Sequence, residues 1–285
     1  MDGPFLGSEA LAAGVMTRHT LRTRFIAIHK DVYVRKGTEP TALNRARACW
    51  LRSRGHGVLA GFSAAAVHGA KWIDPKLPAT VIDDNRRRTP GVVTWAAVLA
   101  EEEICTVDGM RVTTPARTAI DLARRYPLDT AITAVDALAR ATRLTVDAIT
   151  AAAGRYPGRH GLGRVREVLS FVDPGAESPQ ETWLRLVVVR AGYPRPRTQL
   201  PVLNEYGALI GTVDLGWNEH KIAMEYEGKQ HRLSARRFDN DIRRYDEMLD
   251  LGWIVIRITA LDTEETVRRR LAQAWNRRGL PAVSS

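Results

Sequence analysis

Two carboxylates are spaced so that they would face each other across a β-hairpin. Residues 209–217 and 221–228 have the composition of strands, and a short connection joins them. If the hairpin folds about residues 219 and 220, Asp214 lies opposite Glu225, with Cβ atoms about 4.5–5.5 Å apart. Because side chains alternate along a strand, the apolar neighbours are predicted on the other face. These neighbours are Val213, Leu215, Met224 and Tyr226.

Two acids in this position repel each other and destabilise a sheet unless something compensates for their charge. A divalent cation removes the conflict, and oxygen ligands suit Mg²⁺ or Mn²⁺. The spacing therefore predicts a metal site on Asp214 and Glu225. Glu227 shares the face of Glu225 and is predicted to be a further ligand or to position a water molecule.

Groups that move protons and hold phosphates follow the second strand. His231 can act as a general base, and Lys229 lies two residues before it. A metal, an imidazole and guanidinium groups together suit the hydrolysis of phosphodiester bonds. The arginines predicted to hold nucleic acid here are Arg236, Arg237 and Arg244.

The surrounding elements are predicted from caps and periodicity. Ser178-Pro179-Gln180-Glu181 is a capping box with proline at the first helical position, and it opens a helix that runs to about residue 190. Strands at 199–203, 209–217 and 221–228, a helix at 241–251 and a strand at 253–258 follow. The order is αβββαβ.

This order and these residues resemble the PD-(D/E)XK nuclease superfamily, in particular the branch related to very-short-patch-repair endonucleases. The matching residues are Glu181, Val213-Asp214-Leu215, Met224-Glu225-Tyr226-Glu227-Gly228, His231, Asp241, Arg244 and Gly252-Trp253-Ile254-Val255-Ile256-Arg257. The resemblance implies a restriction-endonuclease-like domain that binds Mg²⁺ or Mn²⁺ through Asp214, Glu225 and Glu181.

Two residues leave alternatives open within this resemblance. The capping box already explains Glu181 as a residue that binds backbone N–H groups. Glu227 stands where the superfamily has its lysine, so Lys229 or His231 would have to supply the missing group. The alternative is a domain that has lost catalysis and only binds nucleic acid.

The start of the chain is predicted to be a winged helix-turn-helix. Residues 8–13 form a short helix, Thr17 caps a second helix that ends near residue 25, and residues 26–35 alternate as two strands. The basic residues of the second helix are candidates for DNA contacts, although they would also suit a solvated face. They are Arg18, His19, Arg22 and Arg24.

Between these two domains, residues 41–160 alternate helices and strands. Ser63 is predicted to cap a helix, Asp108-Gly109 predicts a hairpin turn, and Thr114-Pro115 predicts a helix start. The winged-helix start and two segments resemble the AbiEi antitoxin family of type IV toxin–antitoxin systems. The segments are Phe62-Ser63-Ala64-Ala65-Ala66-Val67-His68-Gly69 and Thr114-Pro115-Ala116-Arg117-Thr118-Ala119-Ile120-Asp121-Leu122-Ala123. This resemblance implies DNA binding at a promoter and a cognate toxin as partner. It does not imply catalysis in this region.

Composition agrees with a DNA-binding protein. Lys and Arg number 42 against 32 acids, a formal charge of +10 that favours a polyanion but would also suit a solvated arginine-rich surface. We expect a cytoplasmic α/β protein without a membrane span, and the two cysteines suit reduced thiols. The expected domains are residues 1–40, 41–160 and 176–285, with 161–175 as a linker.

The leading hypothesis is a Mg²⁺- or Mn²⁺-dependent nuclease that an N-terminal winged helix recruits to DNA. The alternative is an antitoxin-type transcriptional regulator whose nuclease-like domain is inactive. A third hypothesis combines both, a nuclease restrained by its own antitoxin-like N-terminus.

Overall fold

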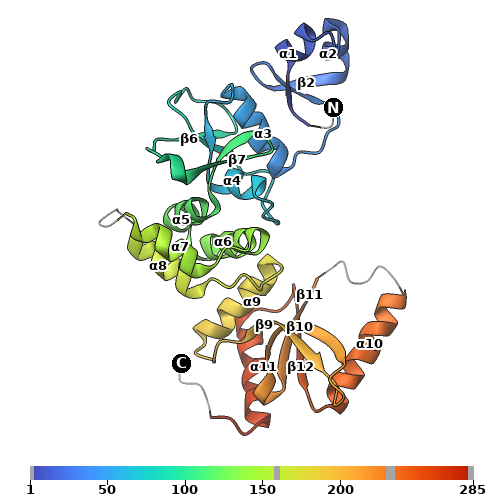
Figure 1. The fold of residues 1–285 in the computed structure, drawn as a ribbon. Helices are drawn as coiled ribbons and strands as arrows, with labels where there is room; N and C mark the ends of the chain where they lie inside the picture. Colours follow the sequence, from blue (N-terminus) through green and yellow to red (C-terminus); the bar gives the residue numbers. More distant parts are fainter. Residues whose placement is uncertain (1–2, 157–160, 229–234, 282–285) are drawn as a thin grey trace. The chain divides into compact units, whose positions relative to one another are not determined.

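The computed structural model describes residues 3–156, 161–228 and 235–281, without the side chains of residues 235–240. It divides into two compact units, Met1–Pro174 and Gly175–Ser285 (Figure 1). The α/β fold class is confirmed. None of the described helices combines the length and apolar character that a membrane span needs.

The first part of unit 1 has the predicted order of helix, helix and hairpin. Thr17 caps the second helix by accepting a hydrogen bond from Thr20 N–H at 3.1 Å. A third helix covers the small sheet, because Ala48 packs with Leu6 and Val32 in one buried cluster. The sheet has the order β1-β3-β2. The elements are β1 (Phe5–Leu6), α1 (Gly7–Ala12), α2 (Arg18–Arg24), β2 (Phe25–His29), β3 (Val32–Arg35) and α3 (Ala42–Arg52).

A mixed sheet of order β6-β5-β4-β8-β7 follows. The predicted hairpin turn joins β7 to β8, and both of its residues have a positive φ, 48° at Asp108 and 76° at Gly109. The prediction for Ser63 was wrong, because Ala60 is the N-cap and Ser63 is buried within the helix, where it accepts a hydrogen bond from Thr80 N–H. The elements are β4 (Val58–Leu59), α4 (Gly61–Val67), β5 (Ala79–Ile82), β6 (Val92–Trp95), a 3-10 turn (Glu101–Glu103), β7 (Ile104–Val107) and β8 (Met110–Thr113).

A group of helices completes unit 1. They are α5 (Pro115–Arg125), α6 (Leu128–Thr142), α7 (Val146–Gly154) and α8 (Leu162–Phe171). Helix α8 occupies most of the segment predicted to be a linker. Its Val165, Val168 and Leu169 are buried, and it packs on α5, α6 and α7. Residues 161–175 are therefore mostly packed helix, and the boundary between the units follows Pro174, close to the predicted domain start at 176.

Unit 2 has the predicted αβββαβ order, followed by a further helix. Its sheet has the order β12-β11-β10-β9, with β12 parallel to β11 and the other neighbours antiparallel. Helices α9 and α11 cover one face and α10 the other (Figure 1). The elements are α9 (Pro179–Arg190), β9 (Arg197–Leu203), β10 (Leu209–Trp217), a 3-10 turn (Asn218–His220), β11 (Ile222–Glu227), α10 (Ala235–Asp250), β12 (Ile254–Thr259) and α11 (Glu264–Arg277).

One detail of β10 differs from strict alternation. Leu215 packs in the cluster that contains Leu184 of α9, whereas Val213 packs with Met248 of α10. The prediction that Val213 and Leu215 share a face was therefore wrong. Between these two residues, Asp214 is not paired with β9, whose intervening residue Gln199 has a φ of +47°.

Candidate metal and nucleic-acid sites

Asp214 and Glu225 lie where the hairpin ladder between β10 and β11 ends. The recorded pairs run from Trp217↔Ile222 to Leu215↔Met224, and one further step brings Asp214 opposite Glu225. At that step Asp214 takes over the role of a backbone acceptor, because its Oδ2 accepts a hydrogen bond from Tyr226 N–H at 2.7 Å. The carboxylate is thus held at the point where the strands separate.

Glu181 reaches the same place from the first turn of α9. Its backbone N–H donates to Ser178 Oγ, as the capping box predicts, and its Oε1 accepts from the same hydroxyl at 2.9 Å. Oε2 accepts from Glu177 N–H at 2.7 Å and from Gln199 Nε2 at 3.0 Å. Gln199 also bonds the Asp214 side chain, so it links the two acids.

The electrostatics of Asp214 reflect this convergence. Burial raises the pKa of Asp214 to about 7, and the negative charges of Glu181 and Glu225 add to the rise. The hydrogen bonds from Tyr226 and Gln199 lower this pKa but do not offset the other effects. A cation bound at Asp214 would oppose both effects, because it would stabilise the charged form of the carboxylate.

The negative charge of Glu225 is compensated by an arginine. The Arg244 guanidinium of α10 binds both of its carboxylate oxygens, with Nη1–Oε1 at 2.6 Å and Nη2–Oε2 at 3.3 Å. Arg244 Nε also lies 3.9 Å from Asp241 Oδ1 on the preceding turn of the helix. The sequence-based expectation for Arg244 was a contact with nucleic acid, and the structure adds a contact with the acidic pair.

Glu227 shares a side of the sheet with Glu225, as predicted, and forms an ion pair with Arg257 of β12. Its role as a ligand or water-positioning group stays a prediction. Lys229 and His231 lie outside the described residues. Arg236 and Arg237 belong to the described backbone of α10, but their side chains lie outside the described part of the chain.

The donor set suits a hard divalent ion, since all three convergent side chains present carboxylate oxygens. Among the described residues, no group of three or more His, Cys, Asp or Glu is close enough to hold a metal ion by itself. Mg²⁺ is compatible with both observations, because it keeps several water ligands and is often held by only one or two carboxylates together with substrate phosphates.

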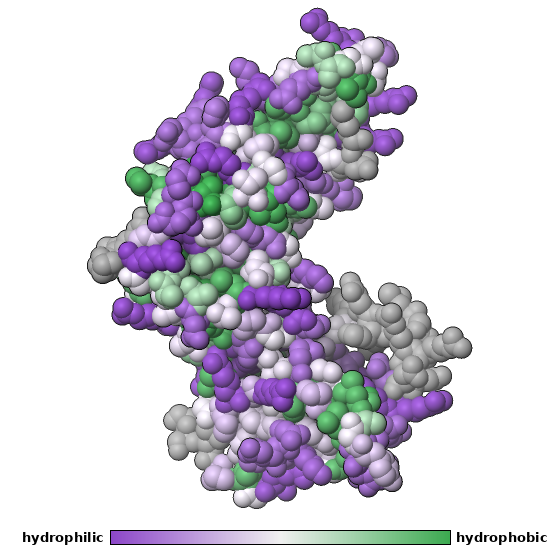
Figure 2. Space-filling model, viewed as in Figure 1, coloured by the Kyte–Doolittle hydropathy of each residue, from purple (hydrophilic) through white to green (hydrophobic). Residues whose placement is uncertain are grey.

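The basic residues of α2 form the second candidate site. Leu21 is buried against the N-terminal core, and the opposite side of the helix is open to solvent. The face of the molecule in Figure 2 is mostly hydrophilic in both units, with apolar residues in small separate areas. All four predicted contact residues are exposed: Arg18, His19, Arg22 and Arg24.

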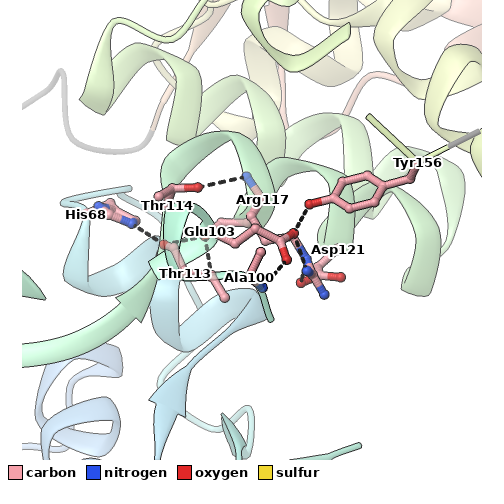
Figure 3. Close-up of polar contacts among 9 residues, drawn as sticks. His68, Ala100, Glu103, Thr113, Thr114, Arg117, Asp121 and Tyr156 are labelled. Atoms are coloured by element: carbon pink, nitrogen blue, oxygen red, sulfur yellow. Dashed lines mark hydrogen bonds and ion pairs between the residues drawn. The ribbon is translucent and has the colours of Figure 1, made fainter. Parts of the chain in front are cut away.

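A third polar constellation lies inside unit 1 and explains the second antitoxin-like segment. Arg117 is buried and donates from Nε to Asp121 Oδ2 at 2.9 Å, and its Nη1 forms an ion pair with Glu103 (Figure 3). Tyr156 and the backbone N–H of Ala100 complete the partners of the Glu103 carboxylate. Through Glu103, the 3-10 turn is thus bonded both to Arg117 of α5 and to Tyr156, two residues beyond α7, so the network has a structural role.

The remaining polar residues of the segment hold the start of α5. Thr114 caps the helix by accepting from Arg117 N–H, and Thr118 Oγ1 bonds both the hydroxyl and the carbonyl of Thr113. His68 Nε2 meets the same carbonyl at 2.8 Å, which ties the first antitoxin-like segment to the second. The two segments are therefore adjacent because one backbone group binds both.

Sequence reasoning missed two participants. Gln199 was assigned only to a strand, and Glu103 was not singled out. A glutamine in a strand or an acid before a strand carries no local sign of its partner, because both partners are distant in sequence.

Comparison with known proteins supports the antitoxin-like part. Two curated proteins of Mycobacterium tuberculosis, from strains CDC 1551 / Oshkosh and ATCC 25618 / H37Rv, are 29% identical over 235 residues, covering 82% of this chain and 86% of each relative. Both are described as uncharacterized. No solved structure matches the chain significantly. Residues 57–171, which contain both antitoxin-like segments and α8, match the model of the AbiEi antitoxin C-terminal domain.

Proposed function

We propose that the chain is a DNA-binding regulator of the antitoxin type. The observation that carries this function is α2, a capped helix next to a hairpin that turns four basic side chains to solvent. A helix of this kind places guanidinium groups against phosphates and base edges in the major groove. The match of residues 57–171 supports the regulatory class and implies a cognate toxin as the protein partner.

The variant Arg18→Gln/Arg22→Gln should bind DNA from the region upstream of its own coding sequence at least about tenfold more weakly than the wild type. Each lost phosphate contact should also reduce the slope of log affinity against log salt by roughly one. Fluorescence anisotropy with a labelled duplex at several salt concentrations measures both quantities.

The matched control is Arg155→Gln/Arg166→Gln, which removes two exposed arginines of the same unit, one directly after α7 and one in α8. It should keep the affinity and the salt slope of the wild type. Equal losses in the two double variants would show that net charge rather than α2 drives binding, and would contradict the assignment of α2 as the DNA-contacting element.

A second function, hydrolysis of phosphodiester bonds, is favoured by the convergence of Glu181, Asp214 and Glu225 in unit 2. Asp214 and Glu225 would hold Mg²⁺ or Mn²⁺, with Glu181 beside them. The metal, when bound, would polarise a phosphoryl oxygen and lower the pKa of a bound water. Arg244 would bind a phosphate bidentately once it leaves Glu225, and Gln199 orients the carboxylates of Glu181 and Asp214. In this proposal the DNA-binding unit delivers the substrate.

The purified full chain should then nick supercoiled DNA with Mg²⁺ or Mn²⁺ and not with EDTA. Glu225→Gln should reduce the rate by at least about a hundredfold, since it removes a ligand charge from the metal site. Glu219→Gln, on the exposed turn between the same two strands, is the control and should keep the wild-type rate. Sequence-specific DNA binding without any turnover would leave the regulator alone as the function.

A further inference from the structure

Arg244 is built into the sheet rather than resting on its surface. Its stem crosses Gly211 of β10, where an added Cβ would stand 2.5 Å from Cδ and 3.2 Å from Cγ of the arginine. Its Nη1 donates to the Thr212 carbonyl at 3.3 Å as well as to Glu225. The absence of a side chain at Gly211 thus leaves space for the Arg244 stem, and this path brings the guanidinium to Glu225.

The Arg244 guanidinium occupies the place at Glu225 where a metal ion would bind. It covers both oxygens of Glu225 in the bidentate geometry that gives the strongest charge-assisted hydrogen bonds. The Glu225 side chain is only 12% exposed, so few directions remain from which another ligand can reach it. A metal ion that binds Glu225 must therefore displace at least one of these bonds.

Arg244 has another carboxylate within reach when it leaves Glu225. Asp241 lies one turn earlier on α10, and its side chain is 47% exposed, whereas the Arg244 side chain is 26% exposed. A guanidinium at this depth can turn from Glu225 toward solvent without a shift of the helix. The same fork geometry fits the two free oxygens of a phosphodiester.

We propose that Arg244 is an internal counter-ion that blocks Glu225 in the metal-free protein. When a divalent ion binds Glu225, the Arg244 guanidinium leaves this carboxylate and binds a phosphodiester instead. The device couples metal loading to the presence of nucleic acid, because each ligand favours the same released position of Arg244. It rests on the second proposed function, since it assumes that Asp214 and Glu225 hold a metal.

The test measures Mn²⁺ binding to the full chain by electron paramagnetic resonance of free Mn²⁺. Arg244→Gln should bind Mn²⁺ roughly tenfold to a hundredfold more tightly than the wild type, because the competing charge-assisted bonds are gone. Arg243→Gln, an exposed arginine next to it on α10, removes the same charge without the contact and should stay within about threefold of the wild type. Arg244→Lys, which keeps the charge but not the fork, should lie between.

Dimethyl phosphate at constant ionic strength tests the coupling with the diester alone. It should tighten Mn²⁺ binding to the wild type and to Arg243→Gln, but not to Arg244→Gln. Equal Mn²⁺ affinity in the wild type, Arg244→Gln and Arg244→Lys, with binding abolished in Glu225→Gln, would overturn the counter-ion role and leave the metal site standing. No Mn²⁺ binding in any variant would overturn the metal site itself.

Discussion

Replacing Arg117 with Met should lower the free energy of unfolding of unit 1 by about 3–5 kcal/mol. Arg117 is 3% exposed and lies between the carboxylates of Glu103 and Asp121, so its loss leaves two buried acids without their ion-pair partner. Asp121 is already poorly satisfied, because its Oδ1 has no hydrogen-bond partner and burial raises its pKa. Hydrogen exchange in peptides from α5, followed by mass spectrometry, reports the stability of this unit separately from the other.

The control is Arg166→Met, which removes an exposed arginine from α8 and should change the stability by no more than about 0.5 kcal/mol. Arg117→Lys keeps the charge but lacks the geometry to bridge two carboxylates, so we expect a smaller loss. If Arg117→Met were as stable as the wild type, the network would not hold α5 in place.

The second large effect concerns Asp214 and pH. Its pKa is raised from 3.8 to about 7, so between these values the folded protein retains a proton that the unfolded chain has released. Stability is then lost as pH rises from about 4 to about 7, by up to roughly 4 kcal/mol in the metal-free protein. Asp214→Asn mimics the protonated form, and it should therefore stabilise unit 2 at pH 8 and have little effect at pH 4.

Hydrogen exchange of peptides from β10 and β11 in EDTA, corrected for the intrinsic effect of pH on exchange, measures this difference. Asp246→Asn, an exposed acid on α10, serves as the control and should behave as the wild type at both pH values. Adding Mn²⁺ at pH 8 should stabilise the wild type and not Asp214→Asn, because the cation takes the place of the proton. A variant that is less stable than the wild type at pH 8 would contradict the raised pKa.

The sequence predicts some of the partners of Asp214 and not others. The pairing of Asp214 with Glu225 follows from two strands and a short turn, so it could be predicted from residues close together in the chain. The field at Asp214 also depends on Glu181 and Gln199, which come from a helix and an edge strand. Their approach depends on how α9 packs on the sheet, and no local pattern records that.

Two corrections to the predictions, at Ser63 and at the predicted linker, have the same physical cause. Ser63 has a side chain suited to capping, but the N-cap of α4 is Ala60, three residues earlier, and the Ser63 hydroxyl instead accepts a hydrogen bond from Thr80 N–H of β5. The predicted linker, residues 161–175, consists mostly of α8, whose buried Val165, Val168 and Leu169 pack within unit 1. In each case burial by distant elements outweighed a local preference.

The sequence by itself determined the helix, helix and hairpin order at the start of unit 1 and the αβββαβ order in unit 2. It also determined the helix starts at Thr17, Thr114 and Ser178 and the hairpin at Asp108-Gly109. These features depend on hydrogen bonds and periodicities within a few residues. Only the tertiary structure decided that Arg244 covers Glu225 and that Arg117 lies between Glu103 and Asp121. A long charged side chain can pair with any group that folding brings near it, so its partner depends on the tertiary structure. Breaking such an ion pair is costly when the pair is buried.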